Sequence, residues 1–299
     1  MKEFGKILIY FIGVIVLGAL LAPPLFWLGQ SVARTGVLTF LGETEFQKFF
    51  NRAVLIAAIA LLWPVTRWLR LGHWRALGLD PDARWKQHLA AGFAAAALVV
   101  ALMAAAYISQ DIYHWKRSDP PWDSLPKLLL SAVVVGLLEE GLFRGGLLGM
   151  FRRSMSPGAA LMSVTSIFAA VHFLQPDEGF AVDHVTWMSG FALAPHLFHQ
   201  FAEPMTILSS LTTIFVLGLV CGAVTLRTRS LWAAIGFHAG VVFVKMSFSK
   251  FTKRDAAYLP WVGEKLEIGL VPVAMLLLGG ALLWLWLRYV DRPLPAPRN

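Results

Sequence analysis

The sequence predicts an all-α integral membrane protein, a bundle of about eight transmembrane helices. Hydrophobic residues make up 57% of its 299 residues and charged residues only 15%, a balance typical of membrane-embedded chains. Apolar segments of about 20 residues, the length that crosses a bilayer, recur along the whole chain. These segments cover residues 7–29, 49–68, 88–108, 125–151, 156–174, 205–226, 230–248 and 267–289.

The first apolar segment has one feature of a secretion signal, because Lys2 and Lys6 precede its apolar core. No convincing small-residue cleavage site precedes Pro23 and Pro24, so we expect a retained helix. Proline kinks in this helix and at Pro64 are tolerable, because neighbouring helices can satisfy the freed backbone groups.

Basic residues set the expected orientation and location. A stretch rich in Lys and Arg runs from Arg67 to Lys86, which favours the cytoplasmic side for this loop and for both termini. Short Arg-rich loops and a compact length favour a bacterial inner (plasma) membrane. Loops that meet anionic lipid explain the formal net charge of +8. We therefore expect a lipid bilayer, and no nucleic acid, among the partners.

The most informative stretch is Glu139-Glu140-Gly141-Leu142-Phe143-Arg144, inside the apolar segment 125–151. A charge at bilayer depth costs roughly 2.5 to 3.5 kcal/mol on insertion scales, so such groups generally mark a functional site. On an α-helix Glu140 and Arg144 stand one turn apart and can pair, whereas Glu139 points elsewhere. Glu139 is then the carboxylate left for general-base chemistry. The alternative is a buried Glu-Glu-Arg triad that only locks two helices together.

Two histidines lie in other apolar segments. Phe168 and His172 share a helix face near the end of the fifth segment, so the aromatic ring can wall one side of the imidazole. His238 lies in the seventh segment. A lone histidine in a membrane helix is often a packed core residue, but two histidines and a glutamate pair favour a joint site. In the sixth segment, Gly218 and Gly222 form a small-xxx-small face that predicts close helix packing.

These motifs, in this order and spacing, resemble the CPBP family of intramembrane proteases, which includes CAAX prenyl endopeptidases and bacterial abortive-infection proteins. The EExxxR motif matches at Glu139, Glu140 and Arg144, and the FxxxH motif at Phe168 and His172. The resemblance extends from Val135 to Lys250. Its third conserved block matches at Phe215, Gly218, Gly222 and His238.

The resemblance implies an eight-helix bundle in which Glu139 and His172 activate water for peptide hydrolysis. Glu140, Arg144 and Phe168 are then supporting residues, and His238 stabilises the oxyanion. The family often has Asn four residues after this histidine, where this chain has Val242. Because valine cannot donate a hydrogen bond, one oxyanion donor is missing or comes from elsewhere.

Several mechanisms and classes stay open. The glutamate-dependent mechanism, which we favour because no His-Glu-x-x-His pairing is present, needs no cofactor. Alternatively, Glu139, His172 and His238 ligate zinc in a metalloprotease. Val242 favours a catalytically silent membrane scaffold or binding protein. A transporter with a proton relay would need inverted repeats and broken helices, which the sequence does not show.

The expected substrate is a membrane-anchored protein or peptide. Residues 1–124 are expected to form the first three transmembrane helices with an interfacial loop at 69–87. Residues 125–250 then form the CPBP-like catalytic core, and 251–299 the last helix and a disordered tail. Residues 1–124 and the acidic loop 175–204 carry no recognised motif, so we expect substrate choice to depend on them.

Overall fold

A computed structural model describes most of the chain. The described residues are 2–68, 84–116, 122–174, 182, 184–197, 204–254, 258, 260–263 and 265–289. Most of the predicted interfacial loop 69–87, parts of the 175–204 loop and the predicted disordered tail after Asp291 lie outside the described residues.

The chain divides into two compact units. The first contains residues 1–72 and 170–204, and the second contains residues 73–169 and 205–299. This division reflects packing within the folded chain. It does not coincide with the expected functional segments 1–124, 125–250 and 251–299, which stay a prediction.

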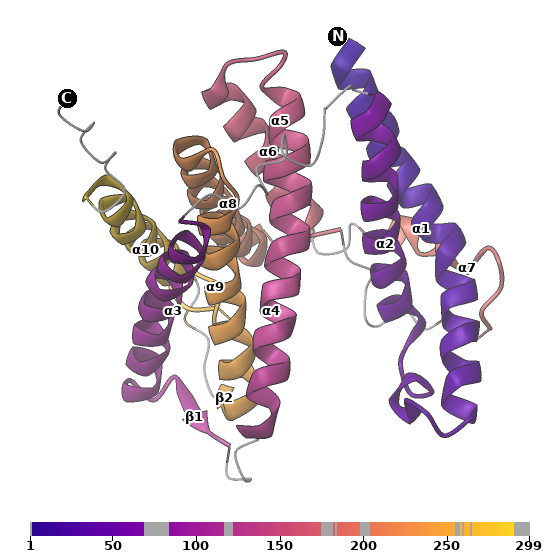
Figure 1. The fold of residues 1–299 in the computed structure, drawn as a ribbon. Helices are drawn as coiled ribbons and strands as arrows, with labels where there is room; N and C mark the ends of the chain where they lie inside the picture. The colour runs from indigo at the N-terminus through magenta and orange to yellow at the C-terminus, as the bar shows by residue number, and fades with distance from the viewer. Residues whose placement is uncertain are drawn as a thin grey trace. The chain divides into compact units, whose positions relative to one another are not determined.

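The first unit is a helical hairpin with a short helix against it. Helix α1 (Lys2–Arg34) leads through the 3-10 helix η1 (Thr39–Leu41) to α2 (Phe46–Trp68), and α7 covers Ser189–Ala192. Helices α1 and α2 run antiparallel and side by side (Figure 1). Tyr10 Oη donates to the Ala58 carbonyl at 2.9 Å. Gly18 lets Val54 approach, and Gly190 of α7 lies against Ala19.

The second unit contains the other elements. Its helices are α3 (Trp85–Ser109), α4 (Leu125–Glu140), α5 (Leu148–Phe151), α6 (Pro157–Val171), α8 (Pro204–Thr228), α9 (Trp232–Phe251) and α10 (Leu270–Tyr289). The last two residues of α6 and the first residue of α8, Pro204, belong to the first unit. A 3-10 helix, η3 (Trp122–Ser124), precedes α4, and a π-helical segment, η4 (Gly141–Leu147), follows it. Strands β1 (Tyr113–Trp115) and β2 (Thr252–Arg254) complete the unit.

The helices confirm the predicted fold class, an all-α integral membrane protein. The segments 49–68, 125–151 and 156–174 all fold as helices, although α6 has only 15 residues, fewer than a bilayer requires. Within the described residues, five helices are long and apolar enough to cross a membrane by length and composition. They are Leu8–Arg34, Trp85–Ser109, Ile207–Thr228, Trp232–Phe251 and Leu270–Tyr289.

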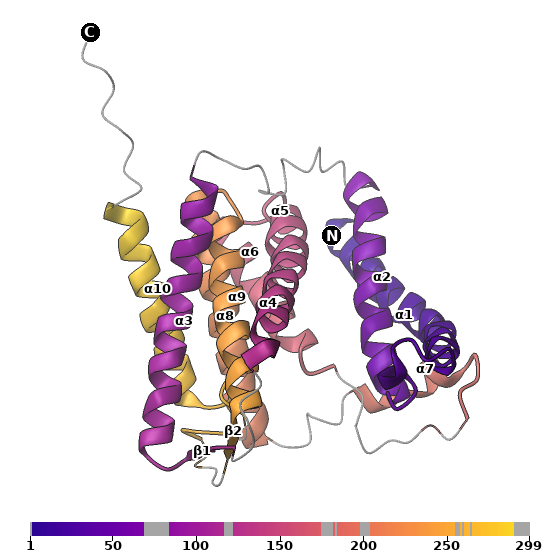
Figure 2. The ribbon, with the colours of Figure 1, turned by 60° about the horizontal axis from the view of Figure 1, so that its bottom comes forward.

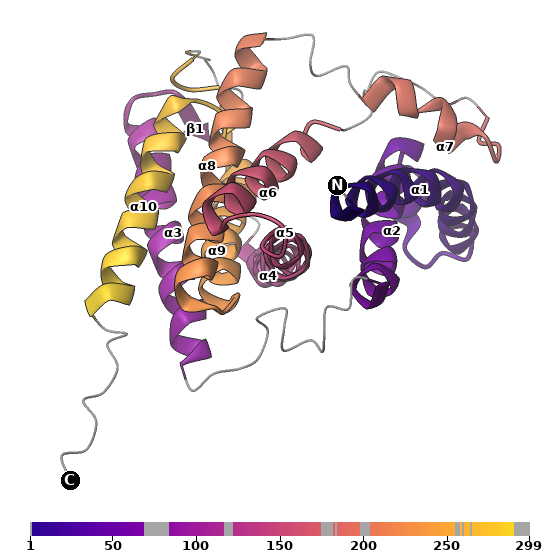
Figure 3. The same ribbon diagram turned by 90° about the horizontal axis from the view of Figure 1, so that it is seen from above.

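Helix α9 is the core of the second unit. It lies between α3 and α4 in two views, and α10 lies beside α3 (Figures 1 and 3). Gly236 sits against the Leu89 carbonyl of α3, and Gly136 of α4 sits against the backbone of α9 at Ile235. A side chain at either glycine would meet backbone atoms that cannot move aside. Glycine therefore lets three helix backbones approach closely, which stabilises membrane bundles by van der Waals contact.

The two strands join the ends of α3 and α9. They pair antiparallel, with Tyr113 opposite Arg254 and Trp115 opposite Thr252. The sheet lies at the end of the unit where α3 and α9 stop (Figure 2). Because β1 follows α3 and β2 follows α9, this pairing ties together the ends of two helices that already pack along their length.

Replacing Gly236 with alanine should destabilise the second unit. The added Cβ would meet the Leu89 carbonyl and come within 2.9 Å of the Phe93 amide nitrogen. We expect a loss of about 1–3 kcal/mol, the usual cost of overpacking a core. Thermal unfolding in detergent measures it. The matched control is Gly158→Ala on α6, where an added Cβ meets no atom within 4 Å. Equal stability of both variants would contradict the close packing of α9.

Candidate active site

The two glutamates end helix α4, where the helix changes geometry. Residues Gly141–Leu147 are π-helical, and Arg144 lies inside this segment. π-helical turns are rare and are frequent at functional sites. The spacing of Glu140 and Arg144 is therefore not the regular α-helical turn assumed from the sequence. The two side chains still meet, because Arg144 Nη1 donates to Glu140 Oε1 at 2.9 Å.

Arg144 is buried, and it contacts α8 and α6 as well as Glu140. Its Nη2 donates to the Gly218 carbonyl of α8 at 2.9 Å. Its guanidinium carbon lies 4.3 Å from the ring centroid of Phe168 on α6, within the range of a cation–π interaction. A Cβ at Gly218 would lie 3.1 Å from Arg144 Nη2 and 3.0 Å from Phe168. Gly218 therefore leaves the space that the guanidinium and the aromatic ring occupy.

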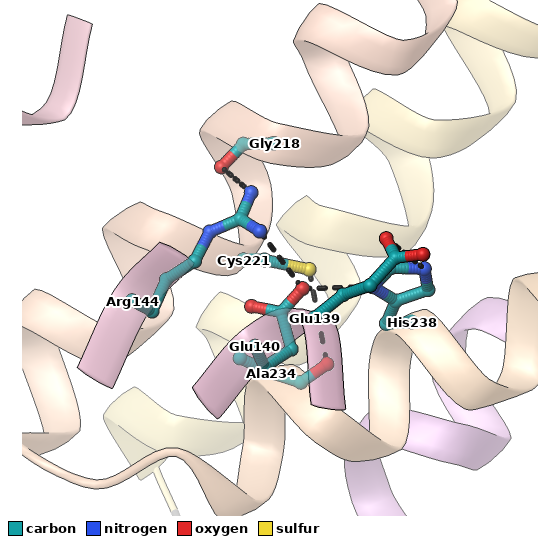
Figure 4. A network of polar contacts seen from close by, with 7 residues as sticks. All are labelled: Glu139, Glu140, Arg144, Gly218, Cys221, Ala234 and His238. Carbon is teal, nitrogen blue, oxygen red and sulfur yellow. Dashed lines mark hydrogen bonds and ion pairs between the residues drawn. The ribbon is translucent and has the colours of Figure 1, made fainter. Parts of the chain in front are cut away.

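Glu140 also holds His238. Its Oε1 lies 2.7 Å from His238 Nδ1, and Figure 4 shows this carboxylate between the arginine and the imidazole. An ionised carboxylate accepts, so Nδ1 carries the proton and donates. The Phe168 ring stands edge-on to the imidazole, with centroids 6.1 Å apart and planes at 88°. The orientation of His238 is thus determined by Glu140 on one side and Phe168 on another.

The contact between Glu140 and His238 did not follow from the sequence. The two residues are 98 positions apart. Helical periodicity relates side chains on one helix, and it pairs Glu140 with Arg144, but it does not say which other helix faces that carboxylate. The sequence shows only that Glu140 and His238 are ionisable residues in separate apolar segments. This pattern predicts a joint site, but it does not predict which side chains contact each other.

Glu139 has a different environment from Glu140. The Glu140 side chain is fully buried, whereas 23% of the Glu139 side chain is exposed. Glu139 Oε2 lies 3.8 Å from His238 Nε2, too far for a direct hydrogen bond. Two atoms at this separation can both contact one water molecule. Glu139 is therefore the less buried carboxylate, although its Oε2 atom is buried, and it lies beside Nε2, the imidazole nitrogen that Glu140 does not contact.

Two further atoms complete the network. Glu140 Oε2 is buried without a hydrogen-bond partner among the described residues. Cys221 of α8 lies beside the two glutamates and is fully buried, with Sγ 3.7 Å from the Ala234 carbonyl that accepts its weak hydrogen bond (Figure 4). Cys221 packs in the wall of the site and is closed to reagents in water.

The remaining predicted residues lie as follows. His172 directly follows α6 and belongs to the first unit, so its position relative to Glu139 is not described. Gly222 of α8 packs against Leu161 of α6. Phe215 is half-buried on α8, and Val242 is half-buried on α9, one helical turn beyond His238.

Of the three residues that would bind zinc in the alternative mechanism, the structure places only two side by side. Glu139 and His238 face each other in the second unit, and the third donor, His172, belongs to the first. Among the described residues, no three His, Cys, Asp or Glu side chains gather at metal-binding distance. His238 Nδ1 is engaged by Glu140, so Nε2 is the nitrogen left for a ligand. The described residues therefore do not by themselves form the tetrahedral donor set that zinc prefers.

Comparison with known families identifies the central part of the chain. Residues 121–244 match the family model of type II CAAX prenyl endopeptidase Rce1-like proteins. This part of the chain is similar to that family. The matched residues include Glu139, Arg144, Gly218 and His238, so the network of Figure 4 lies within the Rce1-like region. At the family level, the chain has the features of a CAAX-type intramembrane protease. Comparison with curated proteins finds no match.

Replacing Arg144 with methionine should strongly destabilise the Rce1-like region. The change leaves the buried Glu140 without its cation, and removing one partner of a buried pair costs about 3–5 kcal/mol. The double variant Glu140→Gln/Arg144→Met buries no unpaired charge, so it should recover part of the loss. Unfolding in detergent compares the two, with the exposed Arg152→Met as control. The ion pair would be unimportant for stability if Arg144→Met behaved like Arg152→Met.

Proposed function

We propose that the protein is an intramembrane endopeptidase that hydrolyses a peptide bond of a membrane-anchored protein or peptide. The observation that supports this most directly is the asymmetry of the glutamate pair. Glu140 is buried and bonded to Arg144 and His238, whereas Glu139 is partly exposed beside His238 Nε2. We infer different roles for the two adjacent carboxylates: Glu140 positions His238, and Glu139, the less buried of the two, acts on the reacting water.

In the proposed reaction, Glu139 is the general base. We propose that one water molecule contacts both Glu139 and His238 Nε2; Glu139 Oε2 and Nε2 are 3.8 Å apart. Glu139 takes a proton as the water oxygen attacks the peptide carbonyl carbon, which forms a tetrahedral intermediate. The intermediate collapses when the C–N bond breaks, and Glu139 returns the proton to the leaving amine. General-base catalysis by a positioned side chain contributes roughly 10²–10⁴-fold.

His238 is proposed to stabilise the oxyanion. Its Nδ1–H donates to Glu140, so donation from Nε2 requires the imidazolium, whose second proton is taken up from solvent before the water attacks and is kept throughout the reaction. The positive charge of this form lies next to Glu140 Oε1, which also neutralises Arg144. Glu140 is therefore a positioning residue: it sets the imidazole orientation and directs Nε2 toward the reacting atoms.

His172 is proposed to position the water with Glu139, as the resemblance to the family implies. Its place in the sequence supports the proposal, since it follows Phe168 by four residues, and Phe168 packs on both Arg144 and His238. We also propose that the protein lies in a bacterial inner membrane with both termini in the cytoplasm, and that it works without a metal cofactor. Zinc bound by Glu139, His172 and His238 is the alternative.

Replacing Glu139 with glutamine should abolish cleavage and leave the fold intact. The amide cannot take a proton, and the side chain is partly exposed, so its loss has little effect on packing. We expect the cleavage rate of membrane-anchored reporter peptides in detergent to fall by about 10²–10⁴-fold. Loss of wild-type activity on treatment with a zinc chelator would replace the metal-free mechanism with the metalloprotease. A wild type that cleaves no peptide of a broad set would favour the silent scaffold.

Replacing Val242 with asparagine should raise the cleavage rate. Val242 lies one turn beyond His238, where an amide N–H₂ can face the same oxyanion. Losing one oxyanion donor costs about 10²–10³-fold where it has been measured, so a gain of up to about 10²-fold is expected, mainly in kcat. Val242→Leu, which supplies no donor, is the control. Equal rates for both variants would show that the oxyanion donor comes from elsewhere.

A further inference from the structure

Strands β1 and β2 lie at the end of the second unit where α3 and α9 stop (Figure 2). Exposed aromatic and basic side chains lie on these strands and on the segments next to them. Four aromatic residues there have exposed fractions between 56% and 63%. Lys116 follows β1 and its Nζ donates to the Ser249 carbonyl at 2.8 Å, and Lys253 of β2 is exposed opposite His114. We name this surface the aromatic–lysine face. It consists of Trp115, Lys116, Trp122, Lys253, Arg254, Tyr258 and Trp261.

The chemistry of this face matches the headgroup layer of a bilayer. Trp and Tyr concentrate at membrane interfaces because their rings are apolar and their N–H or O–H groups are polar. The charged side chains that the structure describes on this face are mainly basic. Asp123 is exposed beside Trp122, and Asp111 lies 3.9 Å from His114. Glu267 Oε1 pairs with Lys245 at 2.6 Å, and its Oε2 is buried without a hydrogen-bond partner among the described residues. Among the described residues, Lys116, Lys253 and Arg254 therefore leave an excess of positive charge.

Two donors beneath this face have no acceptor. Tyr113 and Arg254 stand opposite each other in the sheet, and both Tyr113 Oη and Arg254 Nη1 are buried without a hydrogen-bond partner among the described residues. Burial raises the pKa of the Tyr113 phenol, an effect that Arg254 opposes and Glu267 reinforces, so the hydroxyl keeps its proton. Buried donors without partners are rare, and each one indicates a water or a ligand that supplies the acceptor.

We propose that the aromatic–lysine face binds the headgroup of an anionic phospholipid. Phosphate oxygens accept from Arg254 and Tyr113, the two donors that lack partners, because guanidinium and phosphate match in geometry and charge. Lys116 and Lys253 select an anionic lipid, since a cation near an anionic surface contributes about fivefold in affinity. The exposed aromatic rings lie among the headgroups. This site does not depend on the proposed peptidase activity.

The test is lipid binding to the purified full chain in detergent, followed by native mass spectrometry. The probes are phosphatidylglycerol, phosphatidylcholine and, as a source of free phosphate, glycerol phosphate. We expect wild type to prefer phosphatidylglycerol and the variant Lys253→Gln/Arg254→Gln to bind it more weakly by on the order of tenfold. The control is Lys48→Gln in the first unit, an exposed lysine paired with Glu45 at 3.4 Å, which should bind as wild type does.

A second variant keeps the proposal testable if the double variant does not fold. Tyr113→Phe removes only the buried hydroxyl, so it should fold and lose part of the preference, whereas Tyr258→Phe removes an exposed hydroxyl of the same face and should not. Equal binding of phosphatidylglycerol and phosphatidylcholine by wild type would overturn the proposal. Unchanged phosphatidylglycerol binding by the variants would also overturn the proposal, because water would then be the partner of the two donors. Binding of glycerol phosphate as strong as that of phosphatidylglycerol would overturn it too, because free phosphate would then be their partner.

Discussion

The contact of one buried carboxylate with both Arg144 and His238 is the interaction on which the rest of the site depends. Glu140 Oε1 lies 2.9 Å from the guanidinium and 2.7 Å from the imidazole, with no part of its side chain exposed. An unpaired carboxylate at this depth would be strongly unfavourable, so its partners must be held in place. Four helices do this: α4 supplies the glutamate, α9 the histidine, α8 the Gly218 carbonyl and α6 the Phe168 ring.

Close packing of α9 makes this contact possible. Glycines let α3 and α4 approach the α9 backbone from two sides, and Gly218 gives the guanidinium room on α8. In a membrane bundle such contacts provide much of the attraction between helices, because lipid tails are as apolar as the side chains. The same residues that hold the helices together thus determine where His238 points. Stability and site geometry share one set of contacts.

The asymmetry between Glu139 and Glu140 gives the Rce1-like region its chemical interpretation. A buried carboxylate paired with an arginine is a poor base, because the neighbouring positive charge stabilises its ionised form. A partly exposed neighbour beside a fixed imidazole can meet both water and a peptide carbonyl. Val242 is the departure in this arrangement, since the described site contains one imidazole donor where the family often has an additional amide. In the reaction that we propose, that difference should affect the rate more than the type of reaction.

The sequence by itself determined the fold class, the helical segments and the residues worth examining. Hydropathy over about 20 residues is a local property, and a charge inside an apolar run stands out without any knowledge of the fold. The π-helical turn at Gly141–Leu147, the partners of Arg144 on α6 and α8, and the bond from His238 to Glu140 came only from the tertiary structure. Periodicity relates neighbours on one helix. Which helices meet, and at which glycine, depends on packing among segments far apart in the chain. That packing decided which of the two adjacent glutamates is fully buried and which is partly exposed.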